Sequence, residues 1–190
     1  MGLNFVGDKT FRGQNFTKVR LPKAEYENCI FEGCDFSNSY LDNQNFLECE
    51  FIDCNLSNAN IANTTFNEVL FSSCKMIGLK FETLNDFLIA FRFKDCTMNL
   101  SSFYQMELKN QRFEHCKLIQ TDFVESDLTA SVFDACDLQN ARFEDSNLEK
   151  VDFRTSLNIG LNPNKNHIKK AKFSKDNVLG LLNDFDIIVE

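Results

Sequence analysis

Large apolar residues recur at every fifth position over most of this 190-residue chain. One run extends from Phe11 to Phe81, and a second run, shifted in phase by two residues, extends from Leu88 to Phe153. An α-helix has a period of about 3.6 residues and a flat strand a period of about 2, so neither accounts for this spacing. A fixed short period predicts a solenoid, in which each unit is stable only when it stacks on its neighbours.

The cysteines give the length of one solenoid turn. All eight precede one of the periodic apolar residues by two positions. In the main column they follow one another at intervals of twenty, with one interval of twenty-two: Cys34, Cys54, Cys74, Cys96, Cys116 and Cys136. Four five-residue units therefore form one four-sided coil. The columns stay in register only if the two extra residues lie between Phe81 and Leu88, which predicts a small outward bulge over residues 82–87.

The units also share a chemical pattern. A small residue, then Asp or Asn, then Leu or Phe precede two free positions, as in Cys34-Asp35-Phe36 and Ser146-Asn147-Leu148. This pattern resembles the pentapeptide-repeat family. The resemblance implies an all-β fold, a right-handed quadrilateral parallel β-helix, over residues 1–173, with a loop at 154–167. We also predict that residues 174–190 form a C-terminal helix and short strand for capping or dimerisation.

Neither the cysteines nor the histidines form a recognisable chemical motif. There is no Cys-x-x-Cys pair, and every cysteine occupies the small inward position, so we expect reduced, buried and metal-free thiols. Of the two histidines, His115 occupies an outward position while Cys116 points inward. No hydrolase, nucleotide-binding or metalloprotease motif occurs. We therefore expect no enzymatic activity, no cofactor and no metal site.

The chain carries no visible targeting segment. Its first residues lack a basic stretch followed by an apolar run, and no apolar run approaches the length of a membrane span. We therefore expect a cytoplasmic protein that does not bind membranes.

Charge is unevenly distributed along the chain, whose formal net charge is −8. Residues 24–74 contain nine acidic residues and no Lys or Arg, whereas residues 154–175 contain six Lys or Arg and no acid. This balance argues against direct nucleic-acid binding, since phosphate contacts need a basic footprint. An acidic rod suits a basic partner groove, although acidity also serves solubility alone.

The free positions of the Phe11 and Leu21 columns include carboxylates, whereas the free positions of the Phe16 column have none. The candidate partner-binding acidic face consists of Asp42, Asp53, Glu82, Asp95, Glu114, Glu125, Asp134, Glu144 and Asp145.

The C-terminal segment has two interpretations. Ser174 is a plausible N-cap, and the apolar residues after it follow the spacing of an amphipathic helix, which would cap the open end of the β-helix. The same residues also resemble the C-terminal signature of the quinolone-resistance (Qnr-type) branch of the family. That resemblance implies a homodimer through Val178, Leu181, Leu182, Phe185, Ile187 and Ile188.

The Qnr-type resemblance implies a function as well. In that branch the dimer mimics duplex DNA and binds DNA gyrase or topoisomerase IV, which leads to protection from inhibitors. The longer loops needed for drug protection are replaced in this chain by the small bulge at 82–87. Two hypotheses follow: a DNA mimic that binds a type II topoisomerase, and an interaction scaffold with an unidentified partner.

Overall fold

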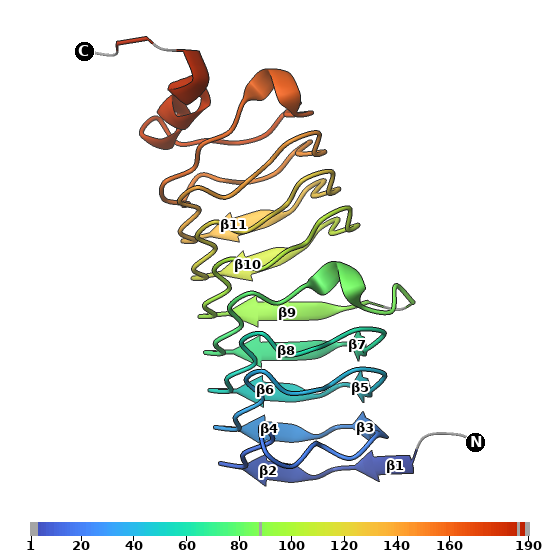
Figure 1. Cartoon of the computed structure of the whole chain (residues 1–190). Helices are drawn as coiled ribbons and strands as arrows, with labels where there is room; N and C mark the ends of the chain where they lie inside the picture. The colour runs from blue at the N-terminus through green and yellow to red at the C-terminus, as the bar shows by residue number, and fades with distance from the viewer. Residues whose placement is uncertain (1–3, 88, 186, 189–190) are drawn as a thin grey trace. The chain divides into compact units, whose positions relative to one another are not determined.

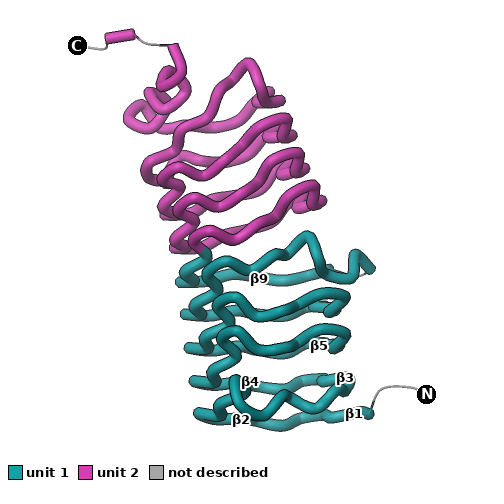
Figure 2. Tube along the Cα trace, viewed as in Figure 1, with its two compact units in different colours: residues 1–98 teal, residues 99–190 magenta. Residues whose placement is uncertain are grey.

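The structure, a computed structural model, describes residues 4–87, 89–185 and 187–188. Its contacts divide the chain into two compact units, Met1–Met98 and Asn99–Glu190 (Figure 2). Each unit is a stack of coils made of short parallel strands, bridges and turns. This arrangement confirms the predicted fold class, an all-β parallel β-helix. The boundary between the units lies within the repeats, whereas the sequence-based division places its boundary after residue 173.

Unit 1 contains two parallel sheets on different sides of its coils (Figure 1). In both, a residue pairs with the one twenty positions later, as Tyr26 with Phe46 and Phe31 with Phe51, which confirms the predicted coil length. One sheet consists of β1 (Asn4–Gly7), β3 (Ala24–Glu27), β5 (Asn45–Leu47) and β7 (Thr65–Asn67). The strands of unit 1 in the other sheet are β2 (Thr10–Arg12), β4 (Ile30–Glu32), β6 (Glu50–Ile52), β8 (Val69–Ser72) and β9 (Phe91–Lys94).

The phase slip lies in the last coil of unit 1. Phe71 pairs with Phe93, twenty-two positions later, whereas the Asn63 amide still donates to the Thr83 carbonyl at 2.8 Å. The two extra residues therefore lie between residues 83 and 91, after the 3-10 helix η1 (Phe81–Thr83). Phe87 in this loop is 68% exposed, but Leu84 is buried, so part of the predicted outward bulge faces the core. Leu88 lies outside the described residues.

Unit 2 has fewer regular strands and ends in two helices. β10 (Arg112–Glu114) pairs with β11 (Val132–Asp134), and isolated bridges continue the same twenty-residue register on its other sides. η2 (Pro163–Lys165) interrupts the coils, and η3 (Asn177–Phe185) lies at the end of the unit (Figure 1).

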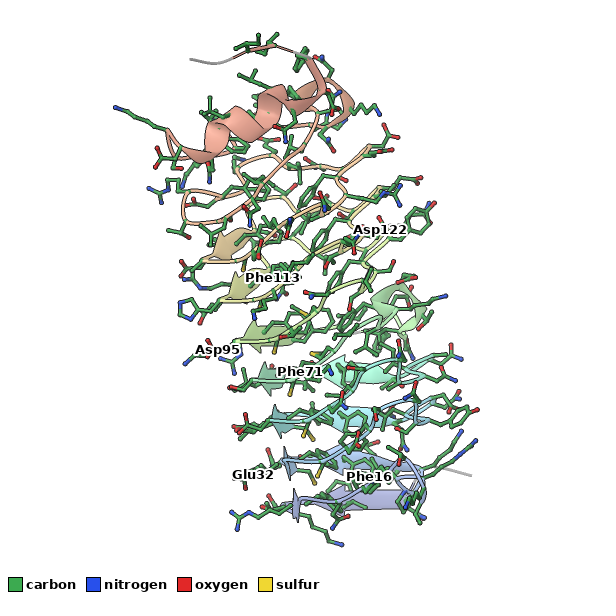
Figure 3. The ribbon with its side chains drawn as sticks, turned by 60° about the vertical axis from the view of Figure 1, so that its left-hand side comes forward. Phe16, Glu32, Phe71, Asp95, Phe113 and Asp122 are labelled. Carbon is green, nitrogen blue, oxygen red and sulfur yellow. The ribbon has the colours of Figure 1, made fainter. Side chains whose placement is uncertain are left out.

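Aromatic rings fill the lumen of both units. The Phe31 and Phe51 rings stack with centroids 4.8 Å apart, and Phe51 meets Phe46 edge-on at 5.3 Å. These inward rings thus stack on a ring of the neighbouring coil and contact the adjacent side in the T-shaped geometry that aromatic quadrupoles favour. Figure 3 shows Phe71 inside unit 1 and Phe113 inside unit 2. All eight cysteines are buried, as predicted, and none forms a disulfide.

The corners of the coils have a left-handed backbone. The second free position of most units has a positive φ, for example +55° at Asn58, +56° at Asn140 and +60° at Gly33. Gly, Asn and Asp adopt this conformation most readily, whereas β-branched residues strain it. The corners therefore hold the second free side chain outward and explain why Asn and Asp are frequent there.

Candidate partner-binding surfaces

Corner geometry places several of the candidate carboxylates on the surface. Four of the nine occupy left-handed corners, with φ between +51° and +56°: Asp53, Asp95, Glu125 and Asp145. All four are exposed, and Figure 3 shows Asp95 at the outer edge of unit 1. Because Asp suits this backbone, three of these four residues have a conformational reason for their identity besides any role in binding.

In unit 1 the candidate carboxylates differ in how they are bonded. Asp42 accepts hydrogen bonds from Lys23 Nζ at 3.2 Å and Asn43 Nδ2 at 2.9 Å. Burial acts to raise the pKa of Asp42, but the bonds from Asn43 and Lys23 outweigh it and hold the pKa below its ordinary value. Among the described residues, neither Asp53 nor Glu82 has a side-chain hydrogen bond or ion pair. These two carboxylates are free to meet a partner.

An arginine neutralises two of the candidate carboxylates in unit 2. Arg112 on β10 donates from Nε to Glu114 Oε1 at 2.6 Å and from Nη2 to Asp134 Oδ2 at 2.5 Å. Thr155 also donates to Asp134, at 3.0 Å. The bond to Glu114 is the main cause that raises the pKa of Arg112. Glu114 and Asp134 therefore form one ion-pair cluster with Arg112 rather than a bare acidic surface.

The remaining candidates of unit 2 lie on another side of the coil. Glu125 accepts hydrogen bonds from Tyr104 Oη at 3.2 Å and from Gln105 Nε2 at 2.7 Å. Glu144 and Asp145 are exposed and, within the described part of the chain, have no side-chain partner. Glu144 and Lys165 both line a shallow polar pocket. Among the described candidates of unit 2, the carboxylates without a side-chain partner are thus Glu144 and Asp145.

A further acidic group on unit 1 was not selected from the sequence. Glu48, Glu50 and Glu68 are exposed, and the described residues offer none of them an ion pair. Glu48 and Glu68 occupy the same corner in successive coils, since the Glu48 amide donates to Asn67, the residue before Glu68. The sequence signal that could have identified Glu48 and Glu68 is their spacing of twenty residues, the length of one coil. We call Glu48 and Glu68 the glutamate corner, whereas Glu50 lies on the adjacent strand β6.

The helix η3 is docked on the end of unit 2. Ser174 and Asn177 cap it reciprocally, with the Asn177 amide donating to Ser174 Oγ at 3.1 Å. The Asn177 side chain then donates to the Phe153 carbonyl at 2.6 Å. A Cβ at Gly180 would lie 1.8 Å from the Ile159 carbonyl oxygen, so only glycine permits this close approach. The predicted helix is present, as a 3-10 helix.

The predicted dimer residues are only partly covered by this docking. Leu181 and Leu182 are half-buried, Val178 is 38% exposed and Phe185 is 44% exposed. Ile187 and Ile188 are 54% and 88% exposed, and these two described residues have no strand conformation. Val189, the last residue of the predicted strand, lies outside the described residues. The end of unit 2 therefore combines a cap with an apolar surface.

His115 and the thiol that follows it lie in different environments. His115 is exposed at a corner, while Cys116 is buried. Burial raises the pKa of the Cys49 thiol to about 12, which keeps it protonated. Over the described residues, no group of three or more His, Cys, Asp or Glu is arranged to hold a metal ion. Nor does that part of the chain contain a helix with the length and apolar character needed to span a membrane.

Comparisons with known proteins agree with this geometry. A family model described as a pentapeptide repeat region matches residues 24–91, 87–162 and 106–181. No curated protein matches the chain in sequence.

Solved structures similar to this chain share its fold. A trypsin-treated variant of QnrB1, described as a plasmid-mediated fluoroquinolone resistance protein, has a TM-score of 0.63 at 16% identity, covering 98% of this chain and 100% of the trypsin-treated chain. Full-length QnrB1 has a TM-score of 0.56 at 14% identity, covering 97% and 100% of the two chains. HetL from the cyanobacterium Nostoc sp. strain PCC 7120 has a TM-score of 0.51 at 13% identity, covering 88% of this chain and 84% of HetL. Identities this low indicate a likeness of fold only.

Proposed function

Because this chain belongs to the pentapeptide-repeat family, we propose that it is a non-enzymatic, cytoplasmic interaction protein that mimics duplex DNA and binds a type II topoisomerase. The observation that carries this proposal is the set of unpaired carboxylates that the coils hold at their surface, among them Asp53, Glu82, Glu144 and Asp145. A basic groove that holds DNA would attract the same array.

The coils suit such mimicry because they fix the carboxylates in space. Neighbouring coils repeat at about 4.7–4.9 Å, while duplex DNA carries one charge per roughly 1.7 Å of axis. The mimic thus offers a lower charge density than DNA. Its backbone is already ordered by the aromatic lumen, so binding costs little conformational entropy.

A scaffold with an unidentified partner is the second candidate. The pairing of Arg112 with Glu114 and Asp134 favours it, because this pairing removes bare charge from one side of unit 2. HetL, which has the same fold, is described as a protein involved in heterocyst differentiation regulation, so the fold does not identify the partner. QnrB1 is described as a fluoroquinolone resistance protein, and we extend protection from inhibitors to this chain as part of the first proposal only.

We further propose that two copies join through η3 and the residues that follow it. The exposed apolar side chains at this end of unit 2 support a self-complementary contact around a two-fold axis.

Binding of the purified full-length chain to DNA gyrase tests the topoisomerase proposal. We expect binding at low salt that weakens as salt rises, because exposed charges are screened, and we expect duplex DNA to compete. The variants D53N/E82Q and E144Q/D145N each remove two unpaired carboxylates and should weaken binding.

The matched control is N38K/N140K. It raises the net charge by the same amount as each carboxylate variant, but in the Phe16 column, whose free positions have no carboxylate. Both asparagines are exposed corner residues, with φ of +52° and +56°. Lys150 adopts the same corner conformation, so the control should fold normally. Absence of gyrase binding at low salt, or binding that resists both carboxylate variants, would contradict the topoisomerase proposal and leave the scaffold.

A further inference from the structure

One corner of the coils carries opposite charges in the two units. Successive coils of unit 1 place Glu48 and Glu68 at this corner, and successive coils of unit 2 place Lys150 and Lys170 at the equivalent repeat position. All four residues are exposed and have a left-handed backbone, with φ between +52° and +61°. The corner therefore accepts either charge without a change of backbone.

The lysine corner of unit 2 comprises Lys150, Lys169, Lys170 and Lys172. The Lys150 amide donates to the Lys169 carbonyl at 2.9 Å, which places the two stretches in adjacent coils. Lys150 contacts Glu149 at 3.3 Å and Lys172 lies 3.7 Å from Asp152. Among the described residues, no carboxylate pairs with Lys169 or Lys170.

The left-handed backbone of this corner does not require a charged residue. Three other coils place Asn28, Asn110 and Ala130 at the same position, with φ of +51°, +59° and +59°. Like charges one coil apart repel each other, in the way that like charges on facing strands do. Two glutamates and two lysines stacked in this way therefore cost stability, and a surface of opposite charge would offset that cost.

We propose that the lysine corner of one copy docks on the glutamate corner of a second copy of this chain. Each corner presents two charges separated by one coil, at about 4.7–4.9 Å, so the two arrays match in spacing as well as sign. Opposite charges arranged in this way set register and partner choice. The contact is separate from the apolar end at η3 and does not depend on topoisomerase binding.

A second copy suits the lysine corner better than a nucleic acid does. A nucleic acid needs an extended basic footprint, which a site of a few lysines on a chain of net charge −8 does not provide. A second copy brings its own unpaired carboxylates at the required spacing.

Cross-linking of isotopically mixed copies tests this contact directly. Equal amounts of ¹⁴N- and ¹⁵N-labelled full-length chain are treated with a carbodiimide, which joins contacting lysines and carboxylates, and the linked peptides are identified by mass spectrometry. We expect mixed-isotope links between Lys150 or Lys170 and Glu48 or Glu68 at low salt. Their yield should fall steeply at high salt because the contact is electrostatic.

Charge exchange separates this contact from non-specific association. K150E/K170E should lower the yield of the mixed-isotope links that the remaining lysines of this corner, Lys169 and Lys172, form with Glu48 or Glu68 by about tenfold or more, because like charges would then face each other. The quadruple variant E48K/E68K/K150E/K170E should restore the links. The control K75E/K117E makes the same change in net charge at exposed lysines of another column and should leave the yield unchanged.

Three results would overturn the proposal. They are an absence of mixed-isotope links in the wild type, an equal loss in K75E/K117E, or failure of the quadruple variant to recover. The lysine corner would be assigned to nucleic acid instead if the wild type formed no mixed-isotope links but bound a duplex DNA fragment, and if K150E/K170E lost that binding.

Discussion

The phase of each residue within its five-residue unit decides its chemistry. Phe51 is buried in the lumen, Ile52 after it is half-buried, and Asp53 is exposed at a corner with a φ of +51°. The carboxylate of Asp53 is therefore held outward by the same coil that buries Phe51. Residue identity is constrained by packing at the first of these positions and by backbone conformation at the last.

Phe113 illustrates the cost of losing one lumen ring. It is fully buried, stacks on Phe133 at 4.9 Å and meets Phe103 and Phe123 edge-on at 5.8 and 5.9 Å. F113A should lower the free energy of unfolding by about 3–5 kcal/mol, because the coil cannot close over the cavity. Chemical denaturation measures the change, and L157A, at a leucine that is 59% exposed, is the control. A loss as small as that of the control would show that the lumen repacks.

Asp152 should make stability depend on pH. Hydrogen bonds from Arg154 are the main cause that lowers the pKa of Asp152, and Lys172 adds to the effect. The pKa of Asp in an unfolded chain is about 3.9. The ionised Asp152 therefore stabilises the folded state above that pH, and this stabilisation is lost as the pH falls through the lowered pKa of the folded state. D152N should therefore be less stable than wild type at pH 7.

Denaturation at several pH values checks this sign. The difference in unfolding free energy between wild type and D152N should shrink as the pH falls below about 4. D145N, at an exposed carboxylate without a side-chain partner among the described residues, should change stability little. A difference that stays constant down to acid pH would contradict the role of the ionised Asp152.

Among the elements, η3 departs most from the repeat. The helix lies against Ile159 and Gly160, where the chain has left the five-residue pattern. Asn162 Nδ2 donates to Asp184 Oδ2 at 2.9 Å and ties the loop to the helix. These contacts cover the end of unit 2, where an uncovered coil would leave unpaired backbone groups.

Replacement of Gly180 tests this docking. In an undocked helix G180A would stabilise by about 1 kcal/mol, since alanine has the higher helix propensity. The structure predicts the opposite sign, because the added Cβ would lie 1.8 Å from the Ile159 carbonyl oxygen. We expect lower stability and faster amide exchange over residues 177–185, whereas L179A at an exposed neighbour should change both little. A more stable G180A protein would refute the close approach.

At the scale of the whole molecule, partner binding depends on surfaces that the fold itself does not require. Packing of the aromatic lumen does not depend on which polar residue occupies the outward free positions. Several of the carboxylates at those positions are paired within their own unit. The unpaired carboxylates, the lysine corner and the exposed C-terminal isoleucines are the features left for association.

The proposed dimer can be tested without disturbing the coils. Ile188 is 88% exposed and Ile187 is 54% exposed, so I187D/I188D should leave the fold intact but abolish a contact that buries both side chains. Light scattering at micromolar concentration should give a dimer for the wild type and a monomer for this variant. L157D adds a charge at another exposed apolar residue of unit 2 and should remain dimeric. A monomeric wild type would disprove the dimer.

Much of the fold was predictable from the sequence because a solenoid is nearly one-dimensional. Each coil contacts its neighbours, so the phase of a residue such as Phe51 or Cys54 states whether it is buried, without knowledge of distant contacts. The same phase predicted a slip between Phe81 and Leu88, since one misplaced insertion would put every later column out of register, and the pairing of Phe71 with Phe93 agrees with two extra residues in that coil.

What only the tertiary structure decided lies outside that periodicity. The sequence placed Glu114 and Asp134 at outward positions, but the pairing of both with Arg112 depends on how long side chains of adjacent coils are directed. The close approach of Gly180 to Ile159 depends likewise on non-repeated segments, which have no phase to place them. Periodicity therefore determined which residues are inside, whereas three-dimensional packing decided which surface charges stay unpaired and how the end of unit 2 is covered.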